Sequence, residues 1–250
     1  MKLATLTSWL DDFLRVGQIG DDTQAFNGLQ VENAGEVTRV AVAVDACQAV
    51  FNAAADLEAD FLIVHHGLFW GGITPLTGRH FTRLQTLLKN GIALYGAHIP
   101  LDVHPEVGNN AVLAGLLGIP VGGMWGMYQG GEVGVWGAAE LSRDELSRRI
   151  GAAIGVTPKV LPCGPARTSR VGIVTGAGGS LIAEAAAAGI DTLVTGEGKH
   201  HSYFDAEELG VNVFYAGHYA TETVGVRALG ERIAREHGLP WSFIDHPTGL

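Results

Sequence analysis

The sequence is poor in positive charge and in cysteine, and both shortages narrow the possible functions. It has 16 Lys and Arg against 26 Asp and Glu, a formal net charge of −10 at pH 7 with histidine neutral. Nucleic acids and anionic membranes bind positive protein surfaces, so we expect neither as the main partner. The two cysteines, Cys47 and Cys163, lie far apart and match no CxxC pair. They indicate neither a disulfide framework nor a thiolate zinc site.

Long apolar runs are also missing. No stretch is apolar enough over a sufficient length to span a bilayer, and the opening residues MKLATLTSWLDDFL are acidic where a signal peptide needs an apolar run. We therefore expect a soluble, cytoplasmic protein. Hydrophobic residues still make up 47% of the chain, enough to bury a substantial core. Glycine, at 36 of 250 residues, is about twice its usual share of roughly 7% and predicts many tight turns.

Strands and helices alternate in the first part of the chain. An amphipathic helix is predicted first, and Val-rich runs such as VAVAVDA then predict buried strands that end in polar residues. The predicted order is helix 3–16, strand 39–46, helix 47–58, strand 60–64, loop 68–79, helix 80–90, strand 92–96 and helix 106–117. This alternation is typical of an α/β fold with helices packed on mixed or parallel sheets.

The pattern is interrupted once and then returns. Residues 121–168 are glycine-rich and carry Trp125 and Trp136, and we interpret them as a connector that packs between two lobes. From residue 169 strands and helices alternate again, with RVGIVTGAGG and DTLVTGEG each read as a strand and a turn. The sequence thus predicts an N-terminal lobe over 1–120 and a C-terminal lobe over 169–250.

The two lobes can be aligned as an internal repeat. When Arg39 is placed on Arg170 without gaps, Asp60 falls on Asp191. Shortening the offset by about the length of the 68–79 loop then places ALYGAHIPLD on VFYAGHYATE. Duplicated halves with polar residues at equivalent strand ends would suit a site in a cleft between the lobes.

Imidazoles and carboxylates gather at these strand ends, where open α/β sheets bind ligands. The set is His65, His66, His98, Asp102, His218 and Glu222. Nitrogen and carboxylate donors without cysteine suit zinc, iron, manganese, cobalt or nickel. The HxxxD and HxxxE spacings place two ligands on one face if the segment is helical. The set therefore predicts a metal site. Because the donors are numerous, we expect two metal ions bridged by a carboxylate.

Simpler readings exist for each part. An isolated His-His pair is often a solvated feature, and HxxxE at a helix start can be a charge effect at the helix terminus. Coincidence at equivalent positions of two repeats favours the metal site. Asp45, Glu197 and Thr221 could orient the histidines, or could serve as turn caps.

Other polar residues are less informative. His200, His201 and Tyr203 could meet a substrate or form a solvent-facing helix face, and His104 could assist proton transfer or be structural. His80, His237 and His246 have no supporting pattern. The turn from Gly176 to Ser180 lacks the last glycine of a dinucleotide fingerprint, so we read Ser180 as a helix N-cap, with a phosphate contact as the alternative.

Several motifs in order resemble a known family. They are NGLQV at 27–31, VAVDA at 42–46, IVHHGLFW at 63–70, AHIPLDVHPEVGNNAVLA at 97–114, TGEGKHH at 195–201 and AGHYATE at 216–222. Together they resemble the Nif-three-like dinuclear metal centre proteins, many of which are labelled GTP cyclohydrolase 1 type 2 homologues. The resemblance is to the short form of the family, without an inserted domain.

The resemblance implies a ligand set and an assembly. The dinuclear site would be built by His65, His66, Asp102, His218 and Glu222, and would hold two divalent ions. His98 would be a neighbouring residue that orients the ligands or carries protons. The resemblance also implies a hexameric toroid, a trimer of dimers.

Two functions are compatible with this sequence. The first is a metal-dependent hydrolase that acts on a small phosphorylated or nucleotide-like substrate through hydroxide bridging two metals. No residue pattern indicates recognition of a guanine base, so the sequence does not specifically predict the GTP ring-opening reaction of the family label. The second is a non-catalytic metal-binding ring assembly, such as a metal chaperone, an insertase or a scaffold for other proteins.

Overall fold

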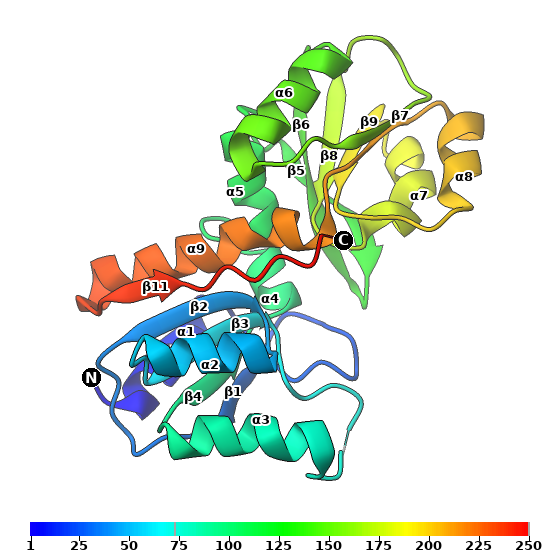
Figure 1. Ribbon diagram of the computed structural model, residues 1–250. Coiled ribbons are helices and arrows are strands. Elements are labelled where there is room, and N and C mark those ends of the chain that lie inside the picture. Colours follow the sequence, from blue (N-terminus) through cyan, green and yellow to red (C-terminus); the bar gives the residue numbers. More distant parts are fainter. Residues whose placement is uncertain (73, 250) are drawn as a thin grey trace. The chain divides into compact units, whose positions relative to one another are not determined.

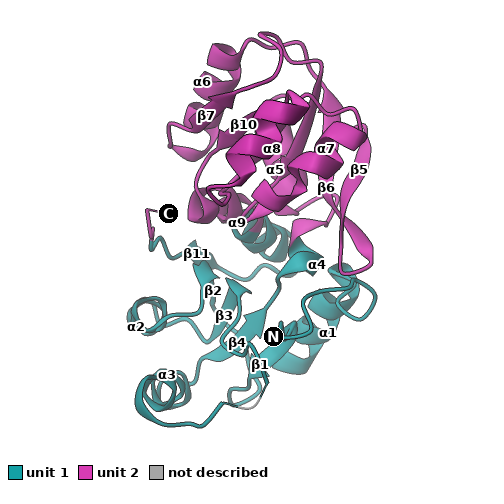
Figure 2. Cartoon of the chain, turned by 90° about the vertical axis from the view of Figure 1, so that its right-hand side faces the viewer, with its two compact units in different colours: residues 1–101, 226–246 teal, residues 102–225, 247–250 magenta. Residues whose placement is uncertain are grey.

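The computed structural model describes residues 1–72 and 74–249, and they form two compact units (Figure 2). Unit 1 consists of Met1–Leu101 and Val226–His246, and unit 2 consists of Asp102–Gly225 with the residues from Pro247 onward. The chain passes between them within helix α4 (Ile99–Asp102) and again within helix α9 (His218–His237). The predicted α/β class with two lobes is confirmed.

Unit 1 contains a five-stranded sheet in the order β1-β4-β3-β2-β11. Its strands are β1 (Gly28–Val31), β2 (Val40–Asp45), β3 (Phe61–His66), β4 (Ala93–Gly96) and β11 (Trp241–Phe243). Strands β11, β2, β3 and β4 run parallel, and β1 pairs antiparallel with β4. The parallel strands end at the same edge, so the last residues of β2, β3 and β4 become neighbours.

Helices cover the sheet of unit 1. They are α1 (Leu3–Phe13), α2 (Gln48–Asp56), α3 (Gly78–Lys89) and the C-terminal part of α9 (Figure 1). Phe51 of α2 and Leu87 of α3 are fully buried in one cluster with Leu62 of β3. This packing explains why the strands read as continuous apolar runs rather than as alternating ones.

Unit 2 contains a six-stranded sheet in the order β5-β6-β8-β9-β10-β7. Its strands are β5 (Gly123–Tyr128), β6 (Gly131–Ala138), β7 (Lys159–Pro162), β8 (Arg170–Val174), β9 (Thr192–Thr195) and β10 (Asn212–Tyr215). Strands β8, β9 and β10 are parallel, whereas β6 and β7 pair antiparallel with their neighbours in that set. The segment 121–168 thus supplies strands and a helix to this unit.

The helices of unit 2 pack on this sheet. They are α5 (Asn109–Leu116), α6 (Arg143–Ile154), the 3-10 helix η1 (Gly178–Leu181), α7 (Ile182–Ala187), α8 (Ser202–Leu209) and the N-terminal part of α9. Leu113 of α5 and Leu146 of α6 share a core cluster with Ile173 of β8. Ser142 caps α6 by accepting a hydrogen bond from the backbone N–H of Glu145, a typical role of serine at a helix start.

The predicted repeat has a structural counterpart at the start of the strands. The Asp60 carboxylate accepts hydrogen bonds from the backbone N–H groups of Thr38 and Arg39 at 2.8–3.1 Å. The Asp191 carboxylate accepts the equivalent bonds from Ser169 and Arg170 at 2.8 and 3.1 Å. The alignment of Asp60 with Asp191 therefore describes one feature built twice, with β2-β3-β4 matching β8-β9-β10.

The compact units divide the chain by spatial contact, and the ranges 1–120, 121–168 and 169–250 divide it by sequence pattern. Those ranges stay a prediction. Among the described residues, none of the helices has both the length and the apolar composition needed to cross a membrane.

Candidate metal centre

Unit 1 brings three histidines together. His65 and His66 end β3, and His98 follows β4. Their ring centroids lie 4.7 to 5.7 Å apart, and one nitrogen from each ring can be chosen so that all three lie within 4.8 Å of one another. His65 is fully buried and the other two are half-buried. These residues could hold a metal ion.

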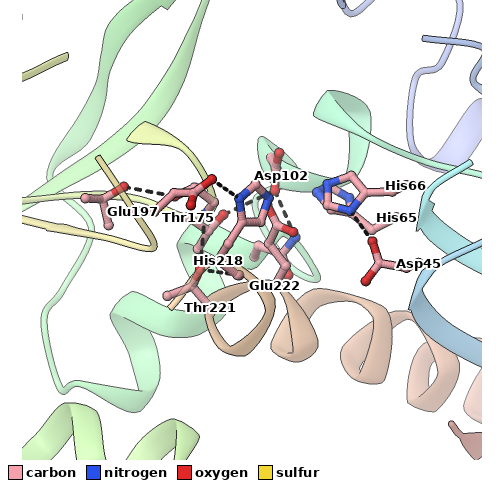
Figure 3. Close-up of polar contacts among 12 residues, drawn as sticks. Asp45, His65, His66, Asp102, Thr175, Glu197, His218, Thr221 and Glu222 are labelled. Carbon is pink, nitrogen blue, oxygen red and sulfur yellow. Dashed lines mark hydrogen bonds and ion pairs between the residues drawn. The ribbon is translucent and has the colours of Figure 1, made fainter. Parts of the chain in front are cut away.

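Hydrogen bonds fix the ring nitrogen that each of these histidines presents. His65 Nδ1 lies 2.9 Å from the carbonyl oxygen of Ala97, and His66 Nδ1 lies 2.8 Å from Asp45 Oδ1 (Figure 3). His98 Nδ1 lies 2.7 Å from an Asp21 oxygen. A carbonyl or an ionised carboxylate only accepts, so each Nδ1 carries the proton. Nε2 is then the nitrogen that would coordinate a metal.

Asp21 is a functional residue that the sequence analysis missed. Its side chain is 7% exposed, and Asn27 Nδ2 and the backbone N–H of Ile99 donate to its Oδ2 at 2.7 and 3.1 Å. Burial alone would raise the pKa of Asp21, but the hydrogen bond and charge of His98, with the bonds from Asn27 and Asp22, hold that pKa below its usual value. The carboxylate is therefore ionised and fixes the His98 ring. It lies in a segment without helical or strand periodicity, which gave no signal.

Two glycines permit close packing beside the histidines. A Cβ atom at Gly67 would lie 2.1 Å from Gln30 Nε2, and one at Gly96 would lie 2.6 Å from it. The Gln30 side chain bonds the backbone of Leu68 and of Phe26 at 2.7 and 2.6 Å. Gln30 of β1 therefore holds the residues that follow β3, and a larger residue at either glycine would have to displace its side chain.

Unit 2 contributes a second, oxygen-rich donor set. His218 begins α9, and Glu222 lies one turn later with its Oε1 3.2 Å from His218 Nε2. Glu197 follows β9 and places Oε1 2.8 Å from His218 Nδ1. The hydrogen bond to Glu222 is the largest influence on His218; with the charges of both carboxylates it outweighs burial and raises the pKa of His218 to about 9. Without metal the ring is an imidazolium at neutral pH, so a metal must displace its Nε2 proton.

Asp102 ends α4 and belongs to the same unit. Its side chain is buried, and its Oδ1 accepts hydrogen bonds from Asn109 Nδ2 at 2.8 Å and from Thr175 Oγ1 at 3.3 Å. The side-chain oxygen Oδ1 of Asn109 in turn accepts a hydrogen bond from the backbone N–H of Gly225 in α9, at 2.7 Å. The orientation of this carboxylate is thus fixed by helices α5 and α9 together.

Glycines also shape the donor set of unit 2. Gly176 has a φ of +65°, and a Cβ there would lie 2.2 Å from Glu222 Oε1. A Cβ at Gly196 would lie 2.7 Å from the Cα of His218. Thr221 Oγ1 accepts from the N–H of Gly176 at 3.1 Å, so Thr221 anchors the turn after β8 rather than a histidine ring. The turn that was a candidate phosphate loop therefore makes room for Glu222.

The remaining candidates take varied places. His104 Nδ1 accepts hydrogen bonds from the backbone N–H groups of Glu106 and Val107 at 3.2 Å, so the side chain stabilises a turn. Ser180 lies inside η1, which begins at Gly178, and the N-cap position of α7 is Leu181. The prediction that Ser180 is a helix N-cap is therefore wrong. His237 packs edge-on against Trp9 in unit 1. His80 lies in α3, His246 follows β11, and His200, His201 and Tyr203 lie at the start of α8.

The sequence is similar to a known protein family and to several of its members. The sequence profile of Duf34/NIF3 (NGG1p interacting factor 3) matches residues 1–248. A GTP cyclohydrolase 1 type 2 homolog of Deinococcus radiodurans is 45% identical over 247 residues, 98% of this chain and 93% of the relative. A protein of the same name from Halobacterium salinarum is 46% identical over the full length of both chains.

The fold matches solved structures equally well. The crystal structure of TTHA1606 from Thermus thermophilus is similar with a TM-score of 0.91 and 43% identity, and the match covers all of both chains. The family resemblance read from the motifs is thereby confirmed. By sequence and by fold, the chain belongs to the Duf34/NIF3 family.

Proposed function

We propose that the protein is a metal-dependent hydrolase of a small molecule. Its two divalent ions would be held by His65, His66, Asp102, His218 and Glu222. The observation that carries the proposal is the orientation of the histidines: each places Nδ1 on an acceptor, either the Ala97 carbonyl or a carboxylate. This arrangement is typical of metal ligands, whose Nε2 must be basic and fixed.

The charges of the donor sets support the same proposal. The carboxylates of Asp102, Glu222 and Glu197 stand in or beside the set of unit 2, whereas unit 1 contributes imidazoles backed by Asp45 and Asp21. Carboxylate oxygens and imidazole nitrogens together form a donor set that divalent first-row ions accept. The donor types suit zinc, iron, manganese, cobalt or nickel and do not choose among them.

The residues would divide the chemistry as follows. A bound divalent ion would lower the pKa of a coordinated water towards neutrality and so supply a nucleophile at neutral pH. His98 would take up or deliver the proton at Nε2, because Asp21 holds its ring through Nδ1. Asp45 and Glu197 would hold His66 and His218 in position.

A turnover assay tests this proposal. Protein reconstituted with zinc, manganese or iron should hydrolyse members of a panel of phosphate esters, nucleotides and cyclic amides. Activity should be lost in Glu222→Ala and kept in His80→Ala, a matched control in helix α3. Metal binding without turnover of any panel member would contradict the hydrolase and favour the non-catalytic metal-binding assembly.

Two further properties are proposals, the first implied by the family resemblance and the second by the composition of the chain. We expect a homohexamer, and we expect it in the cytoplasm. Light scattering coupled to size-exclusion chromatography would test the first, and a mass of a monomer at micromolar concentration would contradict it.

A further inference from the structure

A pocket in unit 2, next to Glu197, has the chemistry of a phosphate subsite. We propose that it binds the phosphate group of a small monoester whose body is apolar or aromatic, through Lys159 and Lys199. The inference rests on the proposed function only in identifying this ligand as the substrate of the metal centre. Binding itself requires neither metal nor turnover.

The pocket lies between the sheet edge and the loop that follows β9. It encloses about 370 Å³, and its walls include Lys159, Leu161, Lys199, His200, Tyr203 and Tyr215. This volume is at the lower end of the range of about 300–1,000 Å³ for small-molecule sites. Leu161 and the two tyrosine rings offer apolar surface, and the lysines offer charge.

The two lysines are the strongest part of the case. The whole chain has only four lysines, and two of them line this one pocket in a protein of net charge −10. The other two, Lys2 and Lys89, lie on unit 1. Among the described residues, Lys159 and Lys199 have no carboxylate within ion-pairing distance, whereas Lys2 pairs with Glu36. The single carboxylate of the lining is Glu197, and it is bonded to His218.

The walls of the pocket are held in place. Lys159 of β7 pairs directly with Tyr215 of β10, so their side chains stand on the same face of the sheet. The hydroxyl groups of Tyr215 and Ser202 lie 2.7 Å apart, and Ser202 Oγ also bonds the carbonyl of Lys199 at 2.5 Å. A Cβ at Gly198 would lie 2.4 Å from the Tyr215 oxygen. The loop that carries Lys199 is thus packed against the ring of Tyr215.

The charge of the pocket selects the ligand class. A phosphate monoester carries about −1.5 to −2 charges at pH 7, which two ammonium groups match. A triphosphate would bring more charge than the lining can offset. Lysine binds phosphate as a point charge, without the two-pronged geometry of arginine. We therefore expect monophosphates to bind better than triphosphates.

The glycine turn after β8 is the rival phosphate site, and the structure argues against it. A second pocket of about 410 Å³ lies there and shares Glu197, Gly198, Lys199 and Ser202 with the first. The N–H of Gly179 is already bonded to the carbonyl of Glu197 at 3.1 Å, and Lys199 is the only lysine of that lining. The first pocket, with two lysines, is the better anion site.

Calorimetric titration of the full chain tests the inference, with phenyl phosphate, inorganic phosphate, phenol and ATP as probes and with chelator-treated protein as a second arm. Phenyl phosphate should bind saturably in both arms, more tightly than inorganic phosphate or ATP, and phenol should not bind. Lys159→Ala and Lys199→Ala should each weaken phenyl phosphate at least tenfold, and Lys89→Ala should not. Tyr203→Ala should reduce the preference for phenyl phosphate over inorganic phosphate.

The outcomes separate this inference from the proposed function. Absence of saturable binding, or binding that neither lysine substitution changes, would overturn the subsite even if the metal-loaded protein hydrolyses other esters. Lysine-dependent binding in chelator-treated protein establishes the subsite even if no turnover is found. If turnover of phenyl phosphate occurs, the lysine variants should raise KM with little change in kcat, since they bind substrate away from the metal ligands.

Discussion

The two halves of the molecule share a strand framework and differ at its carboxyl end. At the amino ends of the strands, Asp60 and Asp191 accept the same backbone hydrogen bonds. At the carboxyl ends, β3 finishes with His65 and His66, whereas β9 is followed by Gly196 and Glu197. Side chains at the carboxyl ends leave the core, so their chemistry can diverge without cost to the sheet.

The divergence divides the donor types between the halves. Unit 1 supplies nitrogen donors from strand ends, each backed by a carboxylate or a carbonyl. Unit 2 supplies carboxylate oxygens from helices, with His218 held between Glu197 and Glu222. In unit 2 the position of the His-His pair is taken by Gly196 and Glu197, and the glycines at 176 and 196 let α9 approach these two turns. One duplicated scaffold thus carries two different sets of potential metal donors.

Removal of one donor from each half gives the largest expected effect. We expect His66→Ala and His218→Ala each to lower metal affinity more than 100-fold, because each deletes a ligand rather than its support. Competition with a chromophoric chelator would measure it. If only one of the two substitutions weakens binding, the halves do not both provide ligands.

The shared amino-end feature should matter for stability and not for metal. Asp60→Ala and Asp191→Ala should each lower the free energy of unfolding by about 1.5–3 kcal/mol, because each removes charge-assisted hydrogen bonds to backbone N–H groups. Urea denaturation of metal-free protein would measure the loss. If either variant changed the metal content at full occupancy, or if only one of them lowered the free energy of unfolding, the two aspartates would not have equivalent roles.

The orienting carboxylates should have a smaller effect than the ligands. Asp45→Asn in unit 1 and Glu197→Gln in unit 2 should weaken metal binding by about 10- to 100-fold, since each loosens one histidine ring. Asp56→Asn, at the exposed end of α2, is the matched control. Equal affinities for wild type and both variants would show that these hydrogen bonds do not support ligands.

The pH dependence of metal binding should come mainly from unit 2. Since the pKa of His218 is raised to about 9 without metal, affinity should fall about tenfold for each pH unit below that value as the proton competes. In the metal-free protein, the stabilisation from this raised pKa is complete below about pH 6.5 and is lost as the pH rises through about 9. Glu197→Gln should move both transitions to lower pH, as titrations of wild type and variant would show. A pH-independent affinity between pH 6.5 and 9 would contradict this assignment.

The smallest expected effect is a spectroscopic one in unit 1. The Trp70 ring lies 5.1 Å from that of His98 and 6.3 Å from that of His66. Binding of a paramagnetic ion such as cobalt or nickel should therefore quench part of the tryptophan fluorescence. The quenching should largely disappear in Trp70→Phe, and equal quenching in that variant would place the ion away from these histidines.

The core strands could be predicted because strands that are buried on both faces have continuous apolar sequences. The predicted strands at 39–46, 60–64 and 92–96 correspond to β2, β3 and β4, whose apolar runs are buried on both faces. The edge strands β1 and β11 were not predicted, because strands of four and three residues are too short to show a clear period. Their pairing with β4 and β2 depends on contacts distant in the sequence.

The sequence named the potential metal donors of the candidate site but only some of the residues that hold them in position. Asp45 could be proposed because it ends the strand beside β3, and it does contact His66. Asp21 contacts His98 across 77 residues from an irregular segment, so no local pattern pointed to it. Asn109 and Thr175, which hold Asp102, are likewise brought to it by tertiary packing. Sequence therefore indicates which groups could coordinate a metal and not how they are held.

Metal content per chain tests the central claim most directly. Elemental analysis of protein purified without chelator or added metal should give about two divalent ions per chain, as a dinuclear centre requires. The ratio should fall in Glu222→Ala and stay unchanged in His80→Ala. A wild-type ratio near zero that added zinc, manganese or iron does not raise would contradict the metal centre and the hydrolase built on it.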